Sequence, residues 1–228
     1  MGSRRLFLGS VAAAGVGAFG VTAIDFPVAA QPAADPVTGE ILRQIRGGFQ
    51  QLIDGNGGNG ARQLATTLRI YAATVNDDRL RAVLRKTNRQ TLLYGAINHT
   101  EMQRVADELG IPKSLQPPHP TTTTLGREQA LERLMKEGLS GLIRQVAAAL
   151  DRGAVNLQER ATQVRNVSRQ CRDCSWACDL VQPSLDAMTV ICAAALLFPP
   201  AMEVCMAATA NYLTVWLACN MCVAFSFC

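Results

Sequence analysis

The residues with the clearest chemical potential in this chain are its eight cysteines, none of which occurs before Cys171. Thiols gathered in this way can oxidise in pairs to disulfides, or their thiolates can bind zinc or an iron–sulfur cluster. The cysteines are Cys171, Cys174, Cys178, Cys192, Cys205, Cys219, Cys222 and Cys228. Their confinement to one end indicates that this end carries a chemistry of its own.

The positions of the cysteines are symmetric about the junction between Phe198 and Pro199. The two inner pairs are equally distant from this junction, and the two outer pairs miss it by about one residue. A chain that turns back at Pro199–Pro200 brings such positions together, so the symmetry predicts one nested set among the 105 pairings that eight cysteines allow. The predicted disulfides are Cys192–Cys205, Cys178–Cys219, Cys174–Cys222 and Cys171–Cys228.

The spacing within each half agrees with a helix. Cys178 and Cys192 are fourteen residues apart, as are Cys205 and Cys219. Fourteen residues are two heptads, which return a helix to nearly the same face. Small alanine neighbours allow the close approach that a disulfide requires. Residues 171–228 are therefore predicted to form a disulfide-stapled antiparallel helical hairpin.

Three other interpretations of this segment remain. Zinc is one, because the pattern C-x-x-C occurs at Cys171 and again at Cys219, and an iron–sulfur cluster on the first three cysteines is the second. The third is a membrane hairpin, because residues 204–228 carry no charged side chain and are long enough to cross a bilayer. Metal spacing leaves half of the cysteines and their symmetry unexplained. Disulfides are favoured, and neither a metal site nor a cofactor is predicted.

The N-terminus predicts export. A twin-arginine motif is followed by an apolar stretch and by small residues, so residues 1–30 are predicted to be a signal peptide cleaved after Ala30. Cleavage after Ala33 or Ala34 is an alternative, and so is retention as an uncleaved anchor. Export by this route delivers the chain to an oxidising compartment, where disulfides persist. The residues of the motif are Ser3, Arg4, Arg5, Phe7 and Leu8.

Charge and pattern divide the rest of the chain near Cys171. Residues 31–170 contain nineteen basic and thirteen acidic side chains, whereas residues 171–228 contain one basic and four acidic. Apolar residues recur at helical spacing through the first part and no alternating strand pattern is found, so the fold class is all-α, a helical bundle followed by the hairpin. Helices are expected near residues 41–53, 64–75, 80–93, 100–109, 127–150 and 155–169, with a glycine-rich loop at 54–60 and a Pro/Thr linker at 112–124.

Outside the cysteines, no pattern predicts catalysis, so the chain is not expected to be an enzyme. His99 has no nucleophile at a recognisable spacing. The run Asp54–Gly60 lacks the acidic pattern of a calcium loop and is interpreted as an inter-helix loop. Four arginines are interpreted as a solvated face, with anionic lipid or nucleic acid as alternatives of which export disfavours the second. They are Arg79, Arg81, Arg85 and Arg89.

Residues 171–228 resemble the C-terminal peptide of the halocin-type secreted bacteriocins. The features that carry the resemblance are the opening Cys171-x-x-Cys174, the stretch from Ile191 through Pro200 that leads to Cys205, and a chain that ends on Cys228. The chain differs in having eight cysteines and in lacking a strongly acidic composition. The resemblance implies a precursor with a twin-arginine signal, whose C-terminal segment is released as an antimicrobial peptide and whose middle segment provides immunity.

The expected function is therefore that of a secreted bacteriocin-like precursor. Its hairpin would act on the membrane, or on a membrane protein, of competing cells, and residues 31–170 would bind the hairpin to shield it or give immunity. The alternative is a non-enzymatic secreted or membrane-anchored protein that uses the apolar hairpin as an anchor or interaction module, because small domains leave apolar surface exposed. No nucleic-acid partner is expected.

Overall fold

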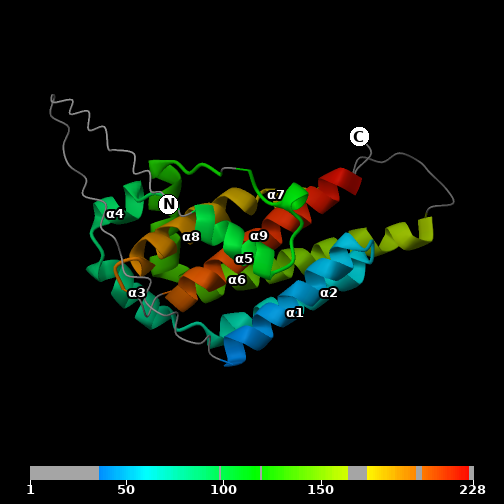
Figure 1. Ribbon diagram of the computed structural model, residues 1–228, viewed down its shortest axis with the longest axis horizontal. Helices are drawn as coiled ribbons and strands as arrows, with labels where there is room; N and C mark the ends of the chain where they lie inside the picture. The colour runs from blue at the N-terminus through cyan, green and yellow to red at the C-terminus, as the bar shows by residue number, and fades with distance from the viewer. Residues whose placement is uncertain (1–35, 98, 119, 164–173, 199–201, 226–228) are drawn as a thin grey trace, which may run out of the picture. The chain divides into compact units, whose positions relative to one another are not determined.

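The computed structural model describes residues 36–97, 99–118, 120–163, 174–198 and 202–225. These residues are mostly helical and form no strand, so the all-α prediction is confirmed. The predicted signal peptide, its export motif and Ala30 lie outside the described residues. The elements, drawn in Figure 1, are α1 (Pro36–Ile53), α2 (Gly57–Thr74), α3 (Asp77–Lys86), α4 (Arg89–Tyr94), α5 (His99–Glu108), the 3-10 turn η1 (Lys113–Leu115), α6 (Thr124–Gln163), α7 (Ser175–Cys178), α8 (Val181–Ala195) and α9 (Met202–Phe225).

Residues 35–228 form one compact unit with one apolar core. The boundary predicted near Cys171 falls inside this unit, because α7, α8 and α9 all pack against helices that precede it. The first helices contribute the apolar stripes that the sequence predicts. In α1, for example, Ile41, Ile45 and Phe49 are buried at the repeat of one helix face.

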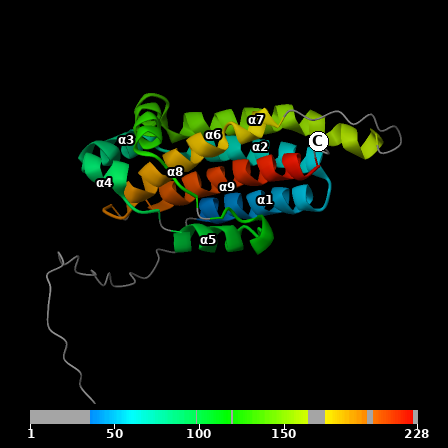
Figure 2. The same ribbon diagram turned by 90° about the horizontal axis from the view of Figure 1, so that it is seen from above.

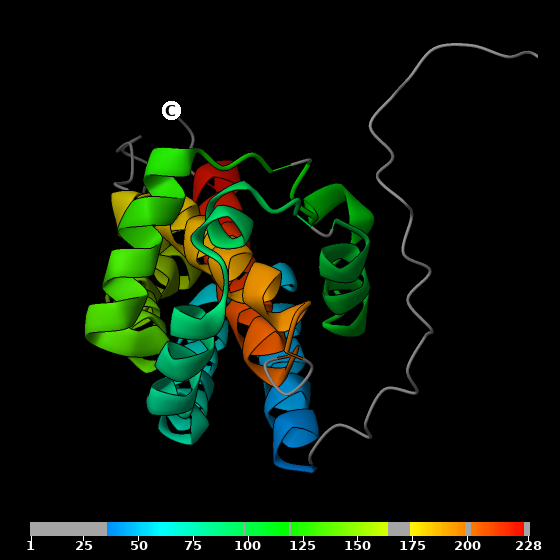
Figure 3. The ribbon, with the colours of Figure 1, turned by 90° about the vertical axis from the view of Figure 1, so that its left-hand side faces the viewer.

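The helix α9 occupies the middle of the unit. Figure 2 shows it between α6 and α8 on one side and α1 and α5 on the other, and the end-on view of Figure 3 agrees. Every residue from Ala207 to Val215 is buried. A helix that is apolar all round must be covered on all sides in water, which explains why other helices surround α9.

The glycine-rich run between α1 and α2 corrects one sequence prediction. A loop is expected at residues 54–60, but α2 already begins at Gly57. The reason is space: a Cβ at Gly60 would lie 2.8 Å from the carbonyl oxygen of Gly48 and 2.8 Å from the amide nitrogen of Leu52. Glycine therefore lets the backbones of α1 and α2 come close, at some cost in helix propensity.

A second correction concerns α6. The sequence predicts a break between residues 150 and 155, but the helix continues there, and its irregularity lies at Gly138 with φ 74° and ψ 173°. A positive φ of this kind is accessible to glycine at little cost. Gly153, in the middle of the predicted break, is buried within α6.

The second half of α6 is capped by a side chain from another helix. Asp77, in the first turn of α3, accepts hydrogen bonds from the backbone N–H of Ser140 at 3.2 Å and from the hydroxyl of Ser140. A Cβ added to Gly138 would lie 2.2 Å from the Cγ atom of Asp77, so the carboxylate occupies the space that a side chain at this position would need. Because the amide groups that follow a helix break lack intrahelical partners, a carboxylate here both satisfies them and favours the helix dipole.

We predict that Asp77→Ala lowers the free energy of unfolding by about 1–3 kcal/mol, since it removes a cap and leaves the buried Ser140 unsatisfied. Asp78→Ala is the matched control, because the Asp78 side chain is 94% exposed and pairs only with Arg81 on its own helix. Urea denaturation with the disulfides intact measures both. Equal losses for the two variants would contradict the capping role.

Candidate functional site

The candidate site is the cysteine-rich segment and its seat in the helical unit. Three disulfides lie in the described residues, and all three are pairs that the symmetry predicts: Cys174–Cys222, Cys178–Cys219 and Cys192–Cys205, with Cα–Cα distances of 5.8, 4.8 and 4.7 Å. The first two join α7 and its preceding residue to α9, and the third joins α8 to α9. The fourth predicted pair, Cys171–Cys228, lies outside the described residues.

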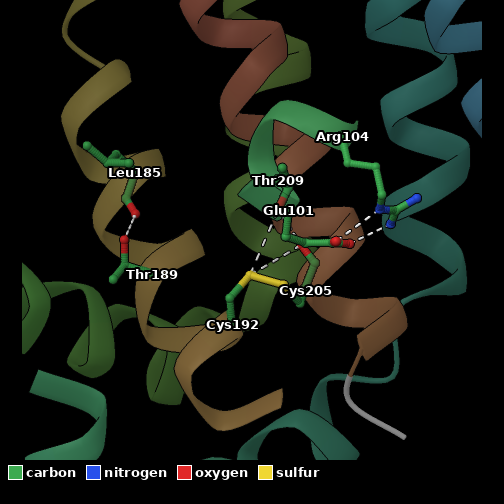
Figure 4. The surroundings of a disulfide bond; sticks show 7 residues. All are labelled: Glu101, Arg104, Leu185, Thr189, Cys192, Cys205 and Thr209. Atoms are coloured by element: carbon green, nitrogen blue, oxygen red, sulfur yellow. Dashed lines mark hydrogen bonds and ion pairs between the residues drawn. A yellow bond between two sulfur atoms is a disulfide. The ribbon is translucent and has the colours of Figure 1, made fainter. Parts of the chain in front are cut away.

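The polar side chains around these disulfides bond within their own helices. Figure 4 shows the Cys192–Cys205 disulfide with Thr209 beside it, where the hydroxyl donates to the carbonyl oxygen of Cys205 at 2.9 Å. Thr189 donates in the same way to Leu185 at 2.9 Å, also visible in Figure 4. Buried hydroxyls satisfied in this way cost little, so α8 and α9 remain effectively apolar towards their neighbours.

The disulfides decide among the alternatives that the sequence leaves open. The six described cysteines are all oxidised, so they offer no thiolates for zinc or an iron–sulfur cluster. Paired cysteines also indicate an extracellular or otherwise oxidising environment. No helix in the described ranges, α9 included, is long and apolar enough to cross a bilayer.

Helices α7 and α8 of this segment pack against three glycines that precede it in the chain. A Cβ at Gly95 would lie 3.3 Å from the Cβ of Ala193 in α8, and one at Gly126 would lie 2.4 Å from a carboxylate oxygen of Asp186. The closest approach is made by the indole ring of Trp176, which a Cβ on Gly153 would meet at 2.3 Å. The missing side chains of these glycines thus provide the space into which α7 and α8 fit.

Two hydrogen bonds also connect the cysteine-rich segment to residues that precede it in the chain. The indole N–H of Trp216 in α9 donates to the carbonyl oxygen of Leu115 in η1 at 2.9 Å. The side-chain amide of Gln182 in α8 donates to the carbonyl oxygen of Thr121 at 3.3 Å. Both acceptors belong to the predicted Pro/Thr linker, which therefore contacts the cysteine-rich segment directly.

A buried pair of opposite charges marks the contact between α8 and α6. Asp186 is 4% exposed and Arg127 is 7% exposed. The guanidinium of Arg127 donates to the carbonyl oxygen of Gly95 at 2.6 Å and to the hydroxyl of Thr122 at 2.7 Å, while Asp186 accepts from Gln182 at 3.1 Å. Each charge therefore has hydrogen-bond partners, as burial of a charge requires.

Burial dominates the protonation of this pair. Removal from water raises the pKa of Asp186 above its ordinary value of 3.8, while the hydrogen bond from Gln182 and the charge of Arg127 oppose the rise. Burial likewise lowers the pKa of Arg127, and the negative charge of Asp186 opposes that shift. The fold thus disfavours the charged form of Asp186.

The other residues considered in the sequence have ordinary surroundings. The side chains of Arg79, Arg85 and Arg89 are exposed, and Arg89 pairs with Glu128 at 3.2 Å. Arg81 donates to the carbonyl oxygen of Met135 at 3.0 Å and pairs with Asp78. His99 begins α5. No group of three or more metal-ligating side chains is found in the part of the chain that the structure describes.

Sequence reasoning missed the pair of Asp186 and Arg127 and the seating glycines. A signal existed for Asp186, because it is the only charged residue in α8 and apolar residues flank it. A lone charge in an apolar helix indicates a buried partner. The glycines gave no such signal, because the space that each provides is defined by residues distant in the chain.

Comparisons with protein-family models, with curated proteins and with solved structures find no match to this chain. Functional inference therefore depends on the geometry and on the sequence pattern.

We predict that Gly153→Ala destabilises the protein by about 1–3 kcal/mol, because the added Cβ would overlap the Trp176 ring in a packed interface. Gly39→Ala is the control. It adds the same methyl group to a helix where nothing lies within 4 Å, and it is expected to stabilise the protein by up to about 1 kcal/mol. Thermal or urea unfolding of both variants measures the difference. Stabilisation by Gly153→Ala would show that Trp176 is not seated on α6.

We predict that stability depends on pH through Asp186. A carboxyl group whose folded pKa is raised binds more protons when folded, so its contribution favours the folded state below pH 3.8 and is lost as pH rises through the raised value. The free energy of unfolding of the wild type, relative to Asp186→Asn, should therefore fall as pH increases above about 4. Asp179→Asn, which alters an exposed carboxylate of the same segment, is the control. A wild-type stability that instead rises relative to Asp186→Asn would contradict this assignment.

Proposed function

We propose that this chain is a twin-arginine-exported precursor of a membrane-active, bacteriocin-like peptide. In this proposal residues 31–170 are a pro-segment that shields the tail or gives immunity, and residues 171–228, the tail, fold as a disulfide-stapled antiparallel hairpin. The tail acts on the membranes of competing cells, and the chain is not an enzyme. The observation that carries the proposal is that an apolar tail is stapled to itself and covered non-covalently by the rest of the chain.

The distribution of the disulfides supports release of the tail. Every cysteine lies at or after Cys171, so no disulfide can connect the tail to residues 31–170. In a protein that used disulfides to stabilise the whole unit, bridges between the two parts would be expected. Here the covalent ties preserve the tail alone, and they would survive removal of everything that precedes it.

The burial of the tail supports the shielding role. From Ser184 to Ile191 in α8 and from Ala207 to Val215 in α9, every residue is buried. The cover comes largely from α1, α2, α5 and α6. Without this cover, two nearly uncharged helices would expose a continuous apolar surface, which is typical of membrane-contacting segments.

The distribution of basic residues favours release by a trypsin-like protease. Lys and Arg occur throughout residues 31–170, and the last basic residue of the chain is Arg172. A protease that cleaves after Lys or Arg would therefore degrade the cover and stop at the edge of the tail. Extensive degradation suits the structure, because one cleavage would leave α9 surrounded by its neighbours.

We predict that trypsin converts the oxidised chain into a resistant fragment of about 6 kDa, close to the share of the 24.5 kDa chain that residues 171–228 represent, because the last cleavable bond follows Arg172. The fragment should release dye from lipid vesicles and kill susceptible cells, while the undigested chain should do neither. Digestion after reduction and alkylation is the control, because without its disulfides the fragment unfolds more readily and loses its resistance to the protease. Mass spectrometry identifies the fragment, and the same mass is expected in culture supernatant.

One observation favours a second function. Because every residue in the middle of α9, from Ala207 to Val215, is buried, the tail is also suited to being the permanent core of a secreted, non-enzymatic protein. In that case the full-length mature chain would be the only secreted species, and the trypsin-resistant fragment would have no effect on vesicles or cells. That combination of results would reject the precursor proposal.

A further inference from the structure

Apolar side chains are exposed where α8 ends and where α9 begins, whereas the middle of both helices is buried. Leu196 is 55% exposed, Leu197 53% and Met202 36%. Tyr94, at the end of α4, is 69% exposed. These four side chains, here called the apolar tip, account for most of the large apolar side chains that are exposed among the described residues.

The members of the apolar tip come from neighbouring elements. Gly95, which follows Tyr94, is so close to α8 that a Cβ there would lie 3.3 Å from that of Ala193. Leu196 and Leu197 follow Ala193 within one helical turn, and Met202 begins α9. Figures 1 and 2 both place α3, α4, the end of α8 and the start of α9 at the same end of the unit.

Basic side chains gather at the same end. Arg85 and Lys86 end α3, Arg89 begins α4, and all three are exposed. Both α3 and α4 pack against α8. Arg89 pairs with Glu128 at 3.2 Å, but Arg85 and Lys86 have no carboxylate within ion-pair distance among the described residues. The nearby acidic residue of the tail is Glu203, in the first turn of α9.

We propose that the apolar tip and this basic cluster form a docking surface for anionic lipid bilayers, and that the surface is available in the intact chain before the tail is released. The inference rests on the proposed function and deepens it, because it names the lipid class to which the chain is drawn. The leucines insert at the boundary between headgroups and acyl chains, while Arg85 and Lys86 lie at the level of the anionic headgroups.

The size of the surface favours a bilayer over a folded protein partner. A stable protein–protein interface requires about 800 Å² from each partner, with shape complementarity across it. Such an interface uses about 20–30 residues on each side, far more than the four of the apolar tip. A lipid surface requires no complementary shape, and exposed apolar side chains bordered by basic residues are the pattern that binds it.

The test is co-sedimentation of the oxidised chain from Gln31 to Cys228 with vesicles, because residues 1–30, apolar with two arginines, would bind vesicles by themselves. Binding is expected to vesicles that contain phosphatidylglycerol, to be weakened by salt, and to be much weaker with phosphatidylcholine alone. Arg85→Gln/Lys86→Gln should reduce affinity about five-fold for each charge removed. Leu196→Ser/Leu197→Ser should reduce it at least about ten-fold. Circular dichroism checks that each variant is folded.

Matched controls distinguish binding by this surface from non-specific adsorption of other exposed side chains to the vesicles. Ile70→Ser removes another exposed apolar side chain, and Arg144→Gln/Arg152→Gln removes two exposed basic residues elsewhere. Neither should change binding. Equal binding to both vesicle types, equal losses in the controls, or a self-association that the leucine variant abolishes would each overturn the proposal. This test measures binding of the undigested chain and does not depend on dye release. Docking can therefore be found even if no membrane-active peptide is released, and a peptide can be released even if the undigested chain does not bind.

Discussion

The fold depends on one constraint, which is that α9 has no polar face. A nearly uncharged helix is stable in water only when other groups cover it completely, because the hydrophobic effect scales with the apolar area removed from water. The helices α8 and α7 pack against it most extensively, and α1, α2, α5 and α6 contribute apolar side chains from the remaining sides, so that together they enclose its middle. Polar atoms within α9 are mostly satisfied by its own backbone, as the hydroxyls of Thr209 and Thr214 are.

The disulfides stabilise the protein in a different way, by lowering the conformational entropy of the unfolded chain. In the entropic account, closing a loop such as that of Cys192–Cys205, with a separation of 13 residues, stabilises by about 3 kcal/mol, and the 41-residue separation of Cys178–Cys219 corresponds to about 4 kcal/mol. These contributions restrict the unfolded chain and are independent of the helices that precede the tail. The conformation of the tail and its burial therefore have separate physical causes.

The sequence predicted the features that depend on position within a short segment. Mirror spacing identified Cys174–Cys222, Cys178–Cys219 and Cys192–Cys205, because two helical arms that fold back place symmetric residues opposite each other. It misjudged Gly57–Gly60 and Gly153, because glycine both weakens a helix and allows close contact, and only the partner decides which matters. Asp186 and Arg127 are 59 positions apart in the chain, and no local pattern connects them.

For the proposed release of the tail, the packing of α7 and α8 favours removal of the helices that cover the tail over withdrawal of the tail from them. Trp176 lies against Gly153, Asp186 lies against Gly126, and both are fixed by α7 and α8, which the disulfides tie to α9. A stapled tail cannot leave one helix at a time, so every contact must be lost together. The covering helices carry no disulfide, so they can unfold or be degraded without breaking a covalent bond of the tail. The tail would then emerge with its disulfides unchanged.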